Sequence, residues 1–184
     1  MTKAFQKGFG LLELVTAVTV LGILVSLAIP SFADIIDARR LQAALHAVQS
    51  HVQQVRSDAI KRNRAMAISY VTQDDGSWAI GYREGSLCNP MENDIEEDDA
   101  CAIDFNGTKA LTLLSSDRFP TISFDANRTL TRFEPVRGTA MGTNVTLVLK
   151  TQRGAEARVI VSNIGRIRLC SPAGPRKLAL YSAC

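Results

Sequence analysis

Two arginines near the C-terminus, Arg166 and Arg168, have the type and spacing of an anion-binding pair. Residues two positions apart in a β-strand point to the same face, so both guanidiniums would lie side by side while Ile167 points into the core. Adjacent guanidiniums repel each other unless they share an anion, and a nucleic-acid phosphate is an obvious one. The alternative is a surface strand whose arginines are solvated, or are paired with Glu156 or with the acidic stretch at residues 92–104.

Four cysteines suggest how this basic region is held. Their number is even, and three pairings are possible. We favour Cys88–Cys101 and Cys170–Cys184, because each bond closes a loop of roughly 15 residues and contributes about 3 kcal/mol in the chain-entropy model. The second bond would close a basic hairpin. A zinc site is disfavoured, because no Cys-x-x-Cys spacing exists and both histidines lie on another predicted element.

Charge is distributed unevenly along the chain, although the net charge is only +3. Residues 92–104 hold seven acidic side chains and no lysine or arginine, whereas residues 150–184 hold seven basic side chains against Glu156 alone. The two predicted cysteine-closed loops therefore carry opposite charges. The acidic stretch lacks the alternating Asp spacing that folds carboxylates around calcium, so we interpret it as a solvated loop and expect no metal.

Catalysis has little support in the sequence. His46 and His51 are five residues apart on a predicted helix and do not share a face well. No Ser-His-Asp grouping and no glycine-rich phosphate loop is present. We therefore expect neither an enzyme nor a bound cofactor.

The N-terminal region contains an apolar run from Phe9 to Ile29 with one charge, Glu13. As a helix this run is about 30 Å long, which is enough to cross a bilayer. A signal peptide fits poorly, because the run is too long and no cleavage site follows it. A plain anchor fits the length but leaves the costly carboxylate unexplained. Lys3 and Lys7 precede the run, which predicts a cytoplasmic N-terminus and an oxidising compartment for the rest.

Hydrophobic periodicity then predicts one long helix from about Gly10 to Arg64, with a kink or loosening at Pro30. Its second half is amphipathic, with an apolar stripe at spacings of three and four residues. The stripe consists of Leu41, Leu45, Val48, Val52, Val55 and Ala59. We expect this stripe to pack on a sheet of the same chain, because about three heptads are marginal for a coiled coil.

After Arg64 the pattern changes to short β-rich runs separated by turns at Gly76, Gly107, Gly154 and Gly165. The predicted strands are 65–72, 77–82, 110–114, 121–124, 144–151, 157–162, 166–169 and 178–182. Strands packed against one N-terminal helix predict an α+β fold with a mostly antiparallel sheet in one globular domain.

The N-terminal residues resemble those of type IV prepilins and type II secretion pseudopilins: a short basic leader ending in Gly8, then Phe9, then Glu13 in the apolar run. The resemblance implies cleavage between Gly8 and Phe9 by a prepilin peptidase and methylation of the new Phe9 amine. It gives Glu13 a partner, the N-terminal amine of a neighbouring subunit in a filament. The implied division is a leader (1–8), a membrane and filament-core helix (9–30) and a pilin domain (31–184). Gly10 departs mildly from the family, where many members have threonine.

A second resemblance lies nearer the C-terminus. Residues 158–168 are similar to the end of the FimT/GspH family, with a strand ending in Ser162, a tight turn at Gly165 and then Gly-Arg-x-Arg. Residues 122–125 resemble an earlier strand of that family. FimT-like members are minor pilins of type IV pili, some of which bind DNA for natural transformation. GspH-like members are minor pseudopilins of type II secretion filaments.

These features predict a FimT-like minor pilin that binds double-stranded DNA without sequence preference and acts in DNA uptake and pilus biogenesis. The predicted DNA-binding residues are Gly165, Arg166, Arg168, Arg176 and Lys177. One alternative is a GspH-like pseudopilin with no DNA role, and another is a subunit that primes pilus assembly and docks a second minor pilin through its basic face. The expected partners are other pilin subunits, the peptidase, and the inner membrane before assembly, with the C-terminal domain in the periplasm.

Overall fold

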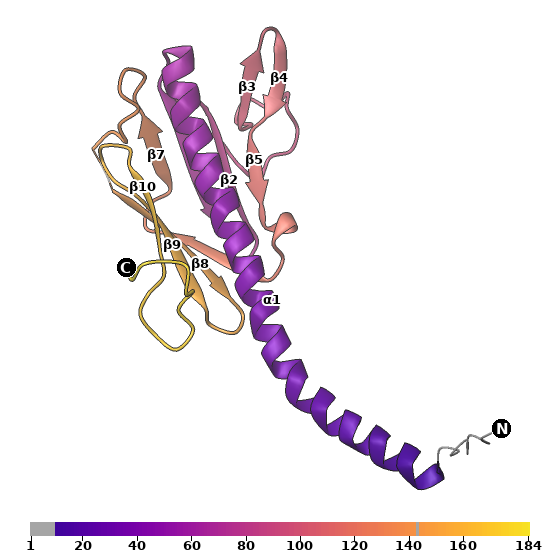
Figure 1. The fold of residues 1–184 in the computed structure, drawn as a ribbon. Coiled ribbons are helices and arrows are strands. Elements are labelled where there is room, and N and C mark those ends of the chain that lie inside the picture. Colours follow the sequence, from indigo (N-terminus) through magenta and orange to yellow (C-terminus); the bar gives the residue numbers. More distant parts are fainter. Residues whose placement is uncertain (1–9, 143) are drawn as a thin grey trace, which may run out of the picture. The chain divides into compact units, whose positions relative to one another are not determined.

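The computed structural model describes residues 10–142 and 144–184, without the side chains of residues 27–31. The chain divides into two compact units, residues 1–37 and 38–184, which are described separately (Figure 1). One helix, α1 (Leu11–Arg62), contributes to both units, so the predicted long helix is confirmed.

In the first unit, α1 begins with exposed apolar side chains, and Glu13 lies exposed in its first turn. The Thr16 hydroxyl donates a hydrogen bond to the Glu13 carbonyl at 2.9 Å. Among the described residues, no helix is both apolar and long enough to cross a membrane. Phe9 and the side chains of residues 27–30 lie outside the described residues, so the predicted membrane segment, 9–30, stays a prediction.

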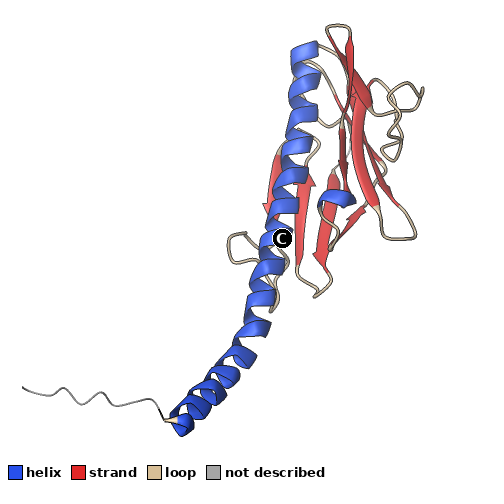
Figure 2. Cartoon of the chain, turned by 90° about the vertical axis from the view of Figure 1, so that its right-hand side faces the viewer, coloured by secondary structure: helices blue, strands red, loops and turns tan. Residues whose placement is uncertain are grey.

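In the second unit, the helix from residue 38 to residue 62 buries the predicted apolar stripe. All six stripe residues are fully buried and belong to one core with the strands. Figure 2 shows this part of the helix running along one side of the β-strands. The packing follows from the sequence, because a stripe repeating every three to four residues presents one continuous apolar face.

The first sheet has the strand order β5-β2-β1-β7, and its neighbouring strands are antiparallel. Its strands are β1 (Met66–Thr72), β2 (Trp78–Glu84), β5 (Leu113–Ser115) and β7 (Leu130–Phe133). The predicted turn between β1 and β2 is present, with Gly76 at φ +86°.

The second sheet has the order β10-β9-β8-β6 and is also antiparallel. Its strands are β6 (Ile122–Ala126), β8 (Val145–Thr151), β9 (Glu156–Val161) and β10 (Ile167–Cys170). Along β9, Ala157, Val159 and Val161 are buried, and the residues between them are partly exposed. One face of this sheet therefore covers the core, and the other carries the charged residues.

A small hairpin, β3 (Ala102–Phe105) and β4 (Thr108–Leu111), and a short 3-10 helix, η1 (Ser116–Arg118), complete the fold. The α+β prediction with antiparallel strands is confirmed, although the strands form two larger sheets and this hairpin.

Four details of the strand prediction differ. The predicted strand 110–114 is divided at Thr112 into β4 and β5. The Thr112 hydroxyl accepts a hydrogen bond from the Tyr82 amide and contacts the carbonyl oxygens of Tyr82 and Cys101. These bonds attach the chain to the first sheet at this point. The predicted strand 178–182 is a series of turns after Pro175, joined to the sheet by one bridge between Ser171 and Ala183. Strands β3 and β7 were not predicted.

Candidate nucleic-acid interface

The turn before β10 positions the predicted arginine pair. Ser162 shapes this turn: its carbonyl accepts a hydrogen bond from the Gly165 amide at 2.8 Å, and its hydroxyl accepts one from the Arg166 amide at 3.1 Å. Gly165 is buried at φ +77°, and a Cβ there would lie 2.2 Å from the Gly138 carbonyl oxygen. Glycine is required for both reasons, since other residues tolerate neither that φ nor that contact.

Arg56 of α1 ties this turn to the helix. Its Nε donates to the Gly138 carbonyl oxygen at 2.9 Å and also lies 3.0 Å from the Cβ position of Gly165. Helix, loop and turn therefore meet at Arg56, Gly138 and Gly165. Gly165, which the sequence predicts as a DNA-binding residue, is buried in the turn that leads into Arg166, and its contact with DNA stays a prediction. Arg56 was not predicted as a functional residue. Its contact with Gly138 joins positions 82 residues apart in the sequence, and the helix spacing carries no signal for it.

Arg166 and Arg168 lie on the same side of the chain, as predicted. Both are exposed and line one hollow of about 230 Å³ with Ile160 and Ser162, whereas Ile167 is partly buried and packs against the core. Arg168 lies opposite Ile160 of β9, on the sheet face that points away from the core. Within the described ranges, neither guanidinium is recorded in an ion pair. The hollow therefore presents two unneutralised cations side by side.

Glu156, the nearest expected counter-charge, is bound elsewhere. Its carboxylate contacts Arg158 at 2.6 Å and Lys150 at 3.2 Å. Partial burial raises the pKa of Glu156, but these two cations outweigh that effect and hold the pKa below its usual range. The structure therefore does not support the alternative in which Glu156 neutralises Arg166 and Arg168.

Arg176 and Lys177 form a separate pair. Both are exposed and line a hollow of about 480 Å³ together with Gly154 and Glu156, beside the turn that joins β8 to β9. That turn is at the opposite end of β9 from Ser162, and the six residues of β9 separate these ends by about 20 Å. The basic residues therefore form two pairs along β9 instead of the single cluster that a short hairpin would give.

The loop that carries Arg176 and Lys177 is closed by the predicted Cys170–Cys184 bond. Inside it, the buried Ser171 hydroxyl donates to the Glu156 carbonyl at 2.7 Å and accepts from the Leu178 amide at 3.1 Å. The Tyr181 hydroxyl lies 2.9 Å from Nε2 of His46 on α1. The loop is thereby fixed to both the second sheet and the helix.

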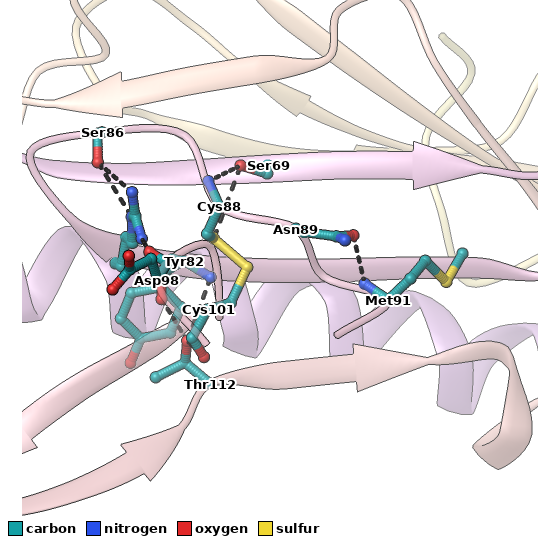
Figure 3. The surroundings of a disulfide bond; sticks show 10 residues. Ser69, Tyr82, Ser86, Cys88, Asn89, Met91, Asp98, Cys101 and Thr112 are labelled. Atoms are coloured by element: carbon teal, nitrogen blue, oxygen red, sulfur yellow. Dashed lines mark hydrogen bonds between the residues drawn. A yellow bond between two sulfur atoms is a disulfide. The ribbon is translucent and has the colours of Figure 1, made fainter. Parts of the chain in front are cut away.

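The other predicted bond, Cys88–Cys101, closes the acidic loop (Figure 3). The Cys88 amide donates to the Ser69 hydroxyl of β1 at 3.1 Å, and the Cys101 carbonyl accepts from the Thr112 hydroxyl at 3.0 Å. Arg83 reaches the Asp98 carbonyl from β2. The acidic loop is therefore attached to the first sheet, and the basic loop to the second.

His46 and His51 have separate surroundings. Whereas His46 contacts the C-terminal loop, the His51 ring packs edge-on against Tyr82 with 5.3 Å between centroids. Its Nε2 is buried and has no hydrogen-bond partner among the residues that the structure describes. Burial lowers the pKa of His51 to about 4, and a backbone hydrogen bond at Thr112 opposes this in part. The neutral imidazole is thus part of the core.

Gly8 and Phe9, the predicted processing residues, lie outside the described residues. Glu13 lies within them and is exposed in the first turn of α1.

Comparison with known proteins gives two family matches. Residues 44–165 match the family model described as type II transport protein GspH, and residues 3–29 match the prokaryotic N-terminal methylation motif. The first match covers about two thirds of the chain and ends one residue before Arg166.

Two kinds of solved structure are similar to this chain. The type IV minor pilin FimU of Pseudomonas aeruginosa aligns in two crystal forms at 20% identity, with TM-scores of 0.44 and 0.48, covering 74% and 76% of this chain and 98% and 96% of FimU. The minor pseudopilin EpsH from the type 2 secretion system of Vibrio cholerae aligns at 11% identity with a TM-score of 0.42, covering 73% of this chain and 99% of EpsH. On the family-model match, the chain belongs to the family described as type II transport protein GspH.

Proposed function

We propose that this protein is a minor type IV pilin that binds double-stranded DNA without sequence preference and acts in DNA uptake and pilus biogenesis. The observation that carries the proposal is the pair Arg166 and Arg168: two exposed guanidiniums in one hollow, while Glu156 is bound to Lys150 and Arg158. A phosphate backbone would neutralise both and accept hydrogen bonds from both. Arg176 and Lys177 supply a second contact to the same backbone.

The position of these residues favours phosphate contacts over base recognition. They lie on a strand and a loop of an antiparallel sheet, and no helix projects them toward a groove. Phosphate contacts orient a protein on DNA and carry no sequence information, so affinity should depend on salt and little on sequence. A separation of about 20 Å between the pairs corresponds to roughly six base pairs of duplex.

The experiment uses the full chain in a non-ionic detergent and fluorescence anisotropy of several labelled 30-base-pair duplexes of unrelated sequence. We expect micromolar dissociation constants that agree within a few-fold among the duplexes. Four phosphate contacts should give a log–log salt slope of roughly −3 to −4. Absence of binding at low salt would reject the proposal and leave the second candidate below.

The second candidate is a minor pseudopilin of a type II secretion system with no DNA role. The GspH match favours it as much as the pilin function. Because that match ends at Gly165, it excludes the residues of both basic pairs. Family membership is therefore compatible with both functions, and DNA binding discriminates between them.

For assembly, we propose that prepilin peptidase cleaves between Gly8 and Phe9, that the Phe9 amine is methylated, and that the protein is held in the inner membrane with a periplasmic domain. The methylation-motif match over residues 3–29 supports this. Glu13 would pair with the Phe9 amine of a neighbouring subunit, because a carboxylate in an apolar filament core needs a cation.

Mass spectrometry of the membrane-extracted chain should show a methylated Phe9 terminus, and an N-terminus after Ala28 or Ala33 would exclude this processing. Glu13→Ala should leave cleavage intact but remove the protein from sheared filaments.

A further inference from the structure

Arg128 and Arg132 form a second pair of arginines, apart from Arg166 and Arg168. Arg128, in the loop before β7, and Arg132, within β7, are both exposed and line an open hollow of about 610 Å³. In the part of the chain that the structure describes, no carboxylate forms an ion pair with either guanidinium. This hollow therefore resembles the one at Arg166 and Arg168 in charge and is larger.

The two arginine hollows are connected through Asn144. Nε of Arg128 donates to the Asn144 carbonyl oxygen at 3.4 Å, and the Asn144 side-chain oxygen accepts from the Asn163 amide at 2.8 Å. Asn163 lies in the turn that leads into Arg166. Two hydrogen bonds thus join the loop of one pair to the turn of the other, although the pairs belong to different sheets.

The loop that carries Arg128 is also fixed to the second sheet. Asn127 exchanges two hydrogen bonds with the backbone of Thr146 in β8: its amide donates at 3.2 Å, and its side-chain oxygen accepts at 2.9 Å. The loop is therefore held before any ligand arrives, and little ordering entropy remains to be lost on binding.

We infer that Arg128 and Arg132 contact the same DNA backbone as Arg166 and Arg168, so that the main contact is made by four arginines around Asn144 and Asn163. This inference rests on the proposed function. It places the strongest phosphate contact at the end of the second sheet where Asn144 is bonded to both Arg128 and Asn163. Arg176 and Lys177 then form an outlying contact at the other end of β9.

The test measures how the affinity for one 30-base-pair duplex depends on salt concentration. It compares the full chain with four double variants, three of which remove two positive charges and one of which keeps them. With these two contacts added to the four of the proposed function, the parental log–log salt slope should be roughly −5, and Arg128→Gln with Arg132→Gln should flatten it by roughly 2. Arg128→Lys with Arg132→Lys should keep the slope, because the charge remains. Arg166→Gln with Arg168→Gln provides the reference for the proposed function. Arg39→Gln with Arg40→Gln is the matched control, since it removes two exposed charges from α1.

The outcomes separate the inference from the proposed function. If the parent binds, the Arg166/Arg168 variant loses slope and the Arg128/Arg132 variant behaves like the control, the inference is wrong and the proposed function stands. If the parent does not bind, both fail. Binding of free phosphate to the Arg128/Arg132 hollow with an unchanged DNA slope would also overturn the inference. Circular dichroism and thermal unfolding must show that every variant compared is folded.

Discussion

The two loops that disulfides close in this protein carry opposite charges. Cys88–Cys101 and Cys170–Cys184 are separated by 13 and 14 residues, and a buried hydroxyl fixes each loop, Ser69 in the first and Ser171 in the second. The first loop is acidic and belongs to the first sheet, whereas the second is basic and extends the sheet that carries Arg166 and Arg168. The two loops therefore share a disulfide of similar span and a buried hydroxyl, and they differ in charge.

The largest expected effect tests how the basic side is positioned. Gly165→Ala should destabilise the fold by about 3 kcal/mol or more, because a positive φ costs about 1–3 kcal/mol for a non-glycine residue and the new Cβ would collide with the Gly138 carbonyl. Gly76→Ala is the matched control, with φ +86° and open space around its Cβ, and should cost about 1 kcal/mol. Urea denaturation of both variants measures the difference. Equal losses would show that the junction of Gly165, Gly138 and Arg56 contributes nothing.

The disulfides give the most direct comparison between the loops. Replacing Cys88 and Cys101 by serine, or Cys170 and Cys184 by serine, should each cost about 3 kcal/mol of unfolding free energy, since the loops are nearly equal in length. DNA affinity should fall only in the second variant, because Arg176 and Lys177 lose their fixed positions. Calorimetry and anisotropy, at a temperature where both variants remain folded, check the two halves of this prediction. A similar loss of affinity in both variants would contradict it.

Much of this arrangement was predictable from the sequence, and the exceptions have physical causes. The helix stripe, both cysteine pairs and most strands follow from local spacing, because periodicity and short loop closure are local properties. The division at Thr112 depends on a hydroxyl bonded to Tyr82 and Cys101, which are distant in the sequence. The separation of the basic residues into two pairs depends on the direction of β10 along β9, which charge counting does not reveal.

A smaller effect is expected from pH, on the acidic-loop side, where His51 contacts Tyr82. The pKa of His51 is about 4 in the folded protein against 6.5 when unperturbed, so protonation favours unfolding. This contribution to stability is complete above pH 6.5 and is lost as the pH falls toward 4. From pH 7 to pH 5 the loss is about 2 kcal/mol. Because other groups also titrate, His51→Gln is the control: its stability should fall by about 2 kcal/mol less over the same range. An unchanged pH dependence would reject this role.

The smallest effect concerns the reach of the basic side. Duplexes of about six base pairs or fewer cannot contact Arg166 and Arg176 together, because about 20 Å of strand separates the pairs. On such duplexes, Arg176→Gln with Lys177→Gln should leave the affinity unchanged, whereas on a 30-base-pair duplex it should weaken binding by about 1 kcal/mol, roughly fivefold in Kd. Competition binding with duplexes of six and 30 base pairs measures this. If the Arg176/Lys177 variant lost the same affinity on the six-base-pair and the 30-base-pair duplex, both basic pairs would contact the same short stretch of DNA.

The most direct test of the central proposal is the salt dependence of DNA binding by Arg166→Gln with Arg168→Gln, measured beside Arg39→Gln with Arg40→Gln in the full chain. We expect the first variant to flatten the log–log slope by roughly 2 and to weaken binding equally for all sequences, because two phosphate contacts are lost. The second variant should keep the parental slope, although it loses the same charge. Equal slopes for the two folded variants would contradict the proposed phosphate contact at Arg166 and Arg168.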